Sequence, residues 1–138
     1  MKKIIVFLML ATILTGGCSM DIKIHKFDSY KDAKDIIERG WIPENIPTNA
    51  TNIQEVHNLD SNKANGRFII PKDETDKFIQ TLEKVDKKSV LDDKFIETKW
   101  FNEKDIKEKI KNNKLTVGTK DDNIYAVSKN GDVYYWAK

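Results

Sequence analysis

The sequence contains a single cysteine, Cys18, so no disulfide bond within the chain can hold the fold together. It has 24 basic and 22 acidic residues, and Lys2 and Lys3 account for the difference. The rest of the chain therefore has a net charge near zero. This balance argues against a nucleic-acid-binding protein, which would carry an excess of basic residues, and against a polybasic membrane-surface protein.

The short motifs of well-known enzyme classes are also missing. The sequence has no Gly-x-Ser-x-Gly nucleophile turn, no His-Glu-x-x-His zinc motif and no phosphate-binding glycine loop. It has two histidines, His25 and His57, and His25 falls in a segment that we expect to be a spacer. A Cys/His or Ser/His/Asp enzyme would have to use His57. We therefore favour a protein without enzymatic activity and expect no cofactor.

The N-terminal apolar run is too short to cross a membrane. From Ile4 to Gly17 it covers about 21 Å at about 1.5 Å per residue, whereas the hydrocarbon core of a bilayer is about 30 Å thick. A basic start, an apolar run and three small residues before Cys18 form instead the pattern of a bacterial secretory signal.

Cys18 stands where bacterial lipoproteins carry their lipid-modified cysteine. Most such signals have leucine three residues before the cysteine, whereas this chain has Thr15 there and Leu14 one position earlier. The alternative is an ordinary cleaved signal followed by an incidental free thiol. Lipid attachment would remove the liability of an unpaired thiol outside the cytoplasm, and we favour it.

With this secretory signal at its start, the chain is expected to have three parts. They are a lipoprotein signal peptide at 1–17, the lipidated cysteine with a spacer at 18–26, and a single globular domain at 27–138. Palmitate or a similar lipid on Cys18 would anchor the protein in a bacterial cell membrane or outer membrane. The domain would face away from the cytoplasm, in the cell envelope.

The pattern of the remaining chain predicts an α+β domain, with a mostly antiparallel β-sheet, about three helices packed on one side and a C-terminal β-hairpin. Capping residues and apolar spacing predict three helices: one from Ser29 to Gly40, with Ser29 and Asp32 as a capping box, one from about Asp73 to Val85, and one that begins after Asn102. Strands are predicted at 52–57, 67–70, 115–120 and 124–128, and Phe95 and Ile96 are candidates for a short strand.

Asn130 and Gly131 give the clearest hairpin signal, because both residues tolerate the positive φ angles of a two-residue turn. Such a turn pairs Tyr125 with Trp136. It then places Tyr125, Val127, Tyr134 and Trp136 on one face of the hairpin.

The segment from Gly40 to Phe68 carries a distinctive pattern. Trp41-Ile42-Pro43 is followed by a second proline four residues later, and then by the step Leu59-Asp60-x-Asn62. This pattern resembles a family of small bacterial lipoproteins and exported proteins. The resemblance implies a small exported domain and no particular activity.

The densest polar group consists of His57, Asp60 and Asn62, with Glu55 nearby. Carboxylate and amide oxygens could hold a hard cation, although the spacing excludes an EF-hand loop. The other interpretation, which we favour, is that Asp60 and Asn62 stabilise a turn through bonds to the backbone. We expect no metal ligands.

The aromatic residues also allow two interpretations. Some of them could form an exposed platform for a ligand or partner, but in a small domain such residues more often fill the core. We favour the core, and we expect Tyr125 and Trp136 to be the most exposed. The full set is Trp41, Trp100, Tyr125, Tyr134, Tyr135 and Trp136.

The leading functional hypothesis is a membrane-anchored, non-enzymatic lipoprotein that binds a protein or a cell-wall component. The alternatives are an immunity or inhibitor lipoprotein against an exported toxin, and an envelope hydrolase or metal-dependent enzyme centred on His57 and Asp60. The candidate binding residues are Trp41, His57, Asp60, Asn62, Tyr125 and Trp136.

Overall fold

The computed structural model describes residues 21–138, so the expected signal peptide and Cys18 lie outside the described residues. The strands are β1 (Ile22–Ser29), β2 (Thr51–Asn58), β3 (Lys63–Ile69), β4 (Glu83–Lys84), β5 (Leu115–Lys120), β6 (Asn123–Ser128) and β7 (Asp132–Ala137). The helices are α1 (Tyr30–Glu38), a 3₁₀ helix η1 (Lys72–Glu74), α2 (Thr75–Gln80), α3 (Lys87–Leu91) and α4 (Glu103–Lys111). None of the helices in this range is long and apolar enough to cross a membrane.

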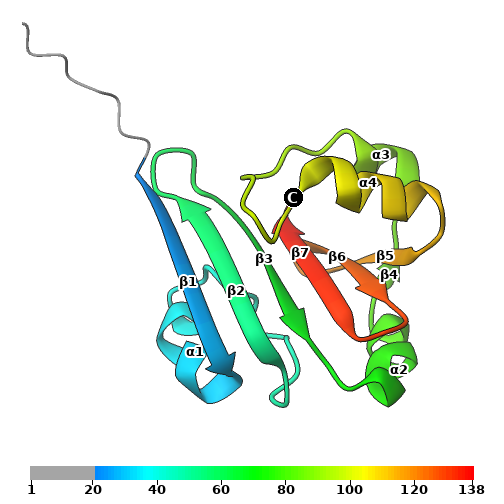
Figure 1. The fold of residues 1–138 in the computed structure, drawn as a ribbon. Coiled ribbons are helices and arrows are strands. Elements are labelled where there is room, and N and C mark those ends of the chain that lie inside the picture. The colour runs from blue at the N-terminus through cyan, green and yellow to red at the C-terminus, as the bar shows by residue number, and fades with distance from the viewer. Residues whose placement is uncertain (1–20) are drawn as a thin grey trace, which may run out of the picture.

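All seven strands belong to one sheet, in the order β1-β2-β3-β7-β6-β5-β4 (Figure 1). Every neighbouring pair is antiparallel. The predicted α+β fold with a mostly antiparallel sheet is therefore confirmed. β1 and β4 form the two edges, and β7 pairs with β3 to join the N-terminal and C-terminal halves of the chain.

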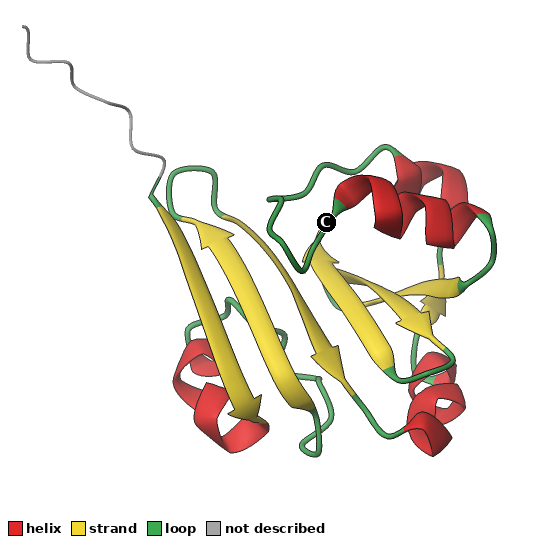
Figure 2. Ribbon diagram, in the orientation of Figure 1, coloured by secondary structure: helices red, strands yellow, loops and turns green. Residues whose placement is uncertain are grey.

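Helices cover both faces of this sheet, whereas the sequence pattern predicts helices on one side. Tyr125 and Tyr135 belong to a core with α1 and α2, whereas Tyr134 and Trp136, the chain neighbours of Tyr135, belong to a core with α3 and α4. Figure 2 shows α3 and α4 side by side over the C-terminal half of the sheet. Because side chains alternate along a strand, a hairpin that is apolar on both faces needs a cover on each.

Two helix starts lie where the capping residues predict them. The hydroxyl of Ser29 accepts a hydrogen bond from the backbone N–H of Asp32 before α1, and the side chain of Asn102 accepts one from Asp105 before α4. The chain leaves α1 through Gly40, whose φ of +83° suits glycine. Local sequence therefore decides where these helices begin and where α1 ends.

The helix predicted from Asp73 to Val85 is wrong in extent. α2 stops at Gln80, where the hydroxyl of Thr81 donates to the carbonyl of Phe78 at 2.6 Å. Glu83 and Lys84 then pair with β5 as the edge strand β4. Pairing with the sheet satisfies backbone groups that a longer helix would have satisfied internally.

The segment around Phe95 and Ile96 forms no regular strand. The side-chain amide of Asn65 bonds both the N–H and the carbonyl of Ile96, at 2.9 and 3.1 Å. One asparagine thus satisfies backbone groups that a neighbouring strand would otherwise pair. Upstream of this segment, the sequence pattern gives no indication of α3, which Asp86 caps.

The spacer expected at 18–26 is shorter in the structure, because β1 begins at Ile22. β1 pairs with β2 from Ile22 to Ser29, and Phe27 lies against Ile53. Backbone pairing with β2 orders this segment, which has few apolar residues for a core strand. The domain therefore starts before residue 27.

The predicted register of the C-terminal hairpin is wrong by one residue. Tyr125 pairs with Tyr135 and not with Trp136, because three residues separate Ser128 from Asp132. The hydroxyl of Ser128 accepts hydrogen bonds from the N–H groups of Asn130 and Asp132. This longer turn moves each β7 side chain to the face opposite the predicted one.

Replacing Gly131 by alanine tests the packing of this turn. Gly131 has a φ of +99°, and a Cβ there would overlap the carbonyl oxygen of Ile70. Gly40 is a matched control, since it also has a positive φ but has open space around the Cβ position. We expect Gly40→Ala to lower the free energy of unfolding by about 1–2 kcal/mol, and Gly131→Ala by at least about 2 kcal/mol more, in urea denaturation. Equal losses would contradict the close approach to Ile70.

Candidate functional site

Three titratable side chains meet on one face of the β1–β2 pair. His25 on β1 lies directly opposite Glu55 on β2, and His57 lies two residues further along β2. Because side chains alternate along a strand, Glu55 and His57 point to the same face, and directly opposed residues share a face. The register of two adjacent strands therefore brings the three groups together.

The carboxylate of Glu55 bonds both imidazoles. Its Oε2 lies 2.7 Å from Nδ1 of His25, and its Oε1 lies 2.6 Å from Nδ1 of His57. The side chain of Glu55 is fully buried and that of His57 is 5% exposed, whereas that of His25 is 32% exposed. The cluster is thus closed on the Glu55 side and reaches solvent through His25 at the sheet edge.

Trp41 covers the cluster from the loop that follows α1. Its ring stacks on His57 with a centroid separation of 3.9 Å and an angle of 7° between the planes. The ring of His57 is in turn nearly parallel to that of His25, at 5.6 Å. Trp41 itself is half-buried, and its carbonyl accepts a hydrogen bond from the hydroxyl of Tyr135 at 3.4 Å. The stack fixes the plane of both imidazoles.

Gly66 and Tyr135 form the inner wall beside Glu55. Gly66 pairs with Glu55 on one side and with Tyr135 on the other. A Cβ at Gly66 would overlap the hydroxyl of Tyr135, so the tyrosine ring can lie across this position only because the residue is glycine. Burial and the nearby Glu55 raise the pKa of Tyr135, which keeps this wall neutral.

Burial dominates the electrostatics of the cluster. It raises the pKa of Glu55 from 4.5 to about 8, because a carboxylate loses hydration in a closed site. Burial also lowers the pKa of His57, and the charge of His25 lowers it further. Asp21 and Lys23, at the start of β1 and joined by an ion pair of 3.1 Å, act on His57 in opposite directions.

The other candidate residues lie elsewhere. Asp60 and Asn62 are exposed in the β2–β3 turn, where the side chain of Asn58 accepts hydrogen bonds from the N–H groups of Asp60 and Ser61. The structure therefore brings Glu55 to His57 and leaves Asp60 apart from them. Asn62 has a positive φ of 54°, as expected for asparagine in a turn.

Tyr125 and Trp136 are buried, contrary to the expectation of partial exposure. Tyr125 is 0% exposed, and its hydroxyl donates to the side-chain oxygen of Asn45 at 2.6 Å. Trp136 is 2% exposed, and its indole N–H donates to Asp93 at 2.7 Å. Each ring is buried in a core, and its polar atom has a partner at the edge of that core.

His25 is the site residue that the sequence reasoning missed. It lies in a segment that reads as a spacer, and an edge strand with only three apolar residues gives a weak signal. The spacing of Glu55 and His57, two residues apart on a predicted strand, could have indicated a shared face. No signal in one sequence indicates which residue lies opposite them.

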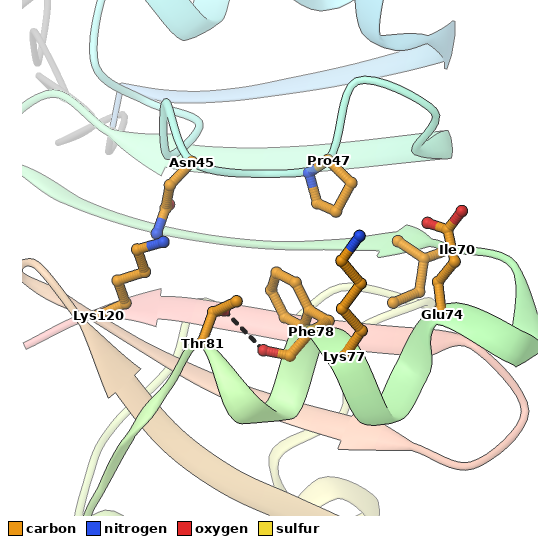
Figure 3. A pocket seen from close by; sticks show the side chains of 8 residues that line it. All are labelled: Asn45, Pro47, Ile70, Glu74, Lys77, Phe78, Thr81 and Lys120. Atoms are coloured by element: carbon orange, nitrogen blue, oxygen red, sulfur yellow. Dashed lines mark hydrogen bonds between the residues drawn. The ribbon is translucent and has the colours of Figure 1, made fainter.

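A pocket of about 220 Å³ lies between α2 and the loop that follows α1 (Figure 3). Ile70 and Phe78 are among its lining residues, and in Figure 3 the side chains of Asn45 and Lys120 point toward each other across it. Its carboxylate, Glu74, is already bonded by Asn49 at 2.9 and 3.0 Å. The pocket shares no residue with the histidine cluster, and we assign the functional site to the cluster.

Residues 21–69 match the family model of the YbbD head domain. The match covers less than half of the chain, from the start of β1 to the end of β3, and includes Trp41 and all three members of the cluster. It supports the assignment of this segment to a small bacterial family. No curated protein and no solved structure matches the chain.

The raised pKa of Glu55 predicts how stability varies with pH in the metal-free protein. An unfolded chain loses the Glu55 proton near pH 4.5 and the folded chain near pH 8, so this group makes the fold less stable as the pH rises between these values. Glu55→Gln removes the effect, since an amide can accept from one imidazole and donate to the other.

The measurement is urea denaturation from pH 5 to pH 8 in the presence of a chelator. We expect the free energy of unfolding of the wild type, relative to Glu55→Gln, to fall by up to about 1.4 kcal/mol per pH unit. Comparison of the two proteins cancels the titration of groups that they share. A relative stability that rises with pH would show that the carboxyl is held ionised in the folded state.

Proposed function

We propose that this protein is a lipid-anchored component of the bacterial cell envelope whose domain binds a ligand and catalyses no reaction. The observation that carries the binding proposal is the buried carboxylate of Glu55, which holds two imidazoles beside a half-exposed tryptophan. Buried titratable clusters are costly for stability and concentrate at functional sites. Such a cluster at a sheet edge supports a binding site there.

The partners of the imidazoles favour binding over catalysis. Among the described residues, Nδ1 of each histidine bonds a carboxylate oxygen, and not a hydroxyl or thiol that it could activate as a nucleophile. The carboxylate fixes the orientation of both rings. His25 and the exposed part of Trp41 are then available to a ligand at the surface.

The position of the N-terminus supports attachment at the membrane. β1 begins four residues after Cys18, and the carbonyl of Asp21 accepts a hydrogen bond from the N–H of Leu59 at 3.1 Å. Figure 1 shows the start of β1 beside the β2–β3 turn. In residues 21–138 the exposed large apolar side chains are Ile22, Ile24 and Leu59, and all three lie at this end of the sheet, where a lipid on Cys18 would hold the domain against the bilayer.

Mass spectrometry of the chain recovered from a bacterial host tests the anchor. We expect the wild type to begin at Cys18, to carry fatty acid and to fractionate with membranes, and we expect Cys18→Ala to lack the lipid. A wild-type chain that is released into the medium with an unmodified Cys18 would support the ordinary signal peptide instead.

Two tryptophan variants test the binding site. Trp41 and Trp100 are both half-buried, but Trp41 stacks on His57 while Trp100 packs against the core on the other face. We expect Trp41→Ala to lose at least about tenfold of the crosslinking to envelope components in intact cells, because it removes an aromatic anchor. Trp100→Ala should retain that crosslinking.

The thermal unfolding of both tryptophan variants is measured beside the crosslinking. Each variant removes a similar packed ring, so similar losses of stability make the comparison direct. Equal crosslinking by the two variants would place the binding surface away from the Trp41–His57 stack.

A further inference from the structure

The three clustered side chains offer the donor atoms of a transition-metal site. The ligand atoms of His25, Glu55 and His57 all lie within 4.8 Å of one another. Two imidazole nitrogens with one carboxylate are a common ligand set for zinc sites that keep a fourth position open. A hard cation such as Mg²⁺ or Ca²⁺ would prefer oxygen ligands alone, so the donors favour Zn²⁺ and its neighbours.

The backbone holds these donors on rigid elements. Glu55 and His57 are two residues apart on β2, and His25 is the direct partner of Glu55 on β1. All three donors are therefore fixed by one ladder of backbone hydrogen bonds, without a loop. Sites on regular elements keep their geometry better than sites on loops.

Whenever Glu55 loses its proton, as it must to bind a metal, its charge requires a positive partner. A fully buried carboxylate is costly unless a cation compensates it, and among the described residues its ion-pair partners are the two histidines, with no lysine or arginine. A divalent ion between the three groups would supply that charge directly. The imidazoles could then be neutral, as metal binding requires.

We propose that His25, Glu55 and His57 form a binding site for a divalent transition metal ion such as Zn²⁺. The two N···O contacts of 2.6 and 2.7 Å are hydrogen bonds, so they open when a metal with ligand distances of about 2.0–2.2 Å replaces the shared protons. His25 gives room for this, because it is 32% exposed on the edge strand. Trp41 closes the other side of His57, so the metal enters from the His25 side, where a fourth ligand can bind.

This inference rests on the proposed binding site and adds a metal ion to it, and its test does not depend on the lipid. The probe is Zn²⁺ alone, titrated by calorimetry into the full-length chain with Cys18→Ser, purified in detergent without a histidine tag and stripped with a chelator. The serine removes the thiol as a competing zinc ligand. A failure of Zn²⁺ to bind would overturn the metal site and leave the results on lipid attachment and crosslinking unchanged.

We expect one Zn²⁺ per chain. His25→Ala, His57→Ala and Glu55→Gln should each weaken the affinity at least about tenfold, and Glu74→Gln should leave it unchanged, because that carboxylate lies in the separate pocket. Glu55→Gln preserves the hydrogen bonds of both imidazoles, so its loss of binding cannot be attributed to unfolding. Binding of Co²⁺ with the absorption of a tetrahedral site would show the coordination directly. Equal affinity in wild type, His25→Ala and His57→Ala would overturn the proposal.

Discussion

The carboxylate of Glu55 is the group around which the N-terminal half of this domain is arranged. It is fully buried, and a buried carboxyl group must find hydrogen-bond partners inside the protein. Two imidazoles provide them, one from the same strand and one from the edge strand. The edge strand β1 is thereby joined to the sheet by a side-chain interaction as well as by its backbone ladder.

The same constraint extends across the sheet. Glu55, Gly66, Tyr135 and Tyr125 occupy successive strands in direct register. Gly66 leaves space for the ring of Tyr135, and the hydroxyls of the two tyrosines reach back to Trp41 and Asn45 in the loop after α1. That loop has two prolines and lacks regular structure, so these bonds and the burial of Ile42 and Ile46 hold it in place. The stack of Trp41 on His57 is a consequence of this arrangement.

Local signals in the sequence were reliable where they depend on a few adjacent residues. Ser29 and Asn102 satisfy exposed N–H groups within their own helices, and no distant contact is needed to predict them. The hairpin register depended on the hydroxyl of Ser128, which supports a three-residue turn where Asn130 and Gly131 alone suggest a two-residue one. A shift of one residue exchanges the faces, and this single difference accounts for the wrong placement of Tyr134 and Trp136.

For a related reason, the sequence alone indicates only some of the residues of the candidate site. The sequence pattern indicates Trp41 and His57 as candidate binding residues, with Glu55 near His57, but the association of the three depends on contacts between separate elements. His25 is 30 residues away from Glu55 along the chain and meets it only through the register of β1 on β2. Strand pairing at such a separation is decided by the whole sheet, so sequence patterning assigned His25 to a spacer.

The position of the site also limits what can reach it. Ile22 follows Cys18 by four residues, and a chain segment of that length extends at most about 14 Å. With a lipid on Cys18, the start of β1 lies close to the bilayer surface. His57 lies at the same end of the sheet, because its partner on β1 is Lys23, the second residue of that strand. A large partner would have to approach past the lipid headgroups, whereas a metal ion would not. The short connection therefore favours a small ligand, or a partner that itself lies at the membrane surface.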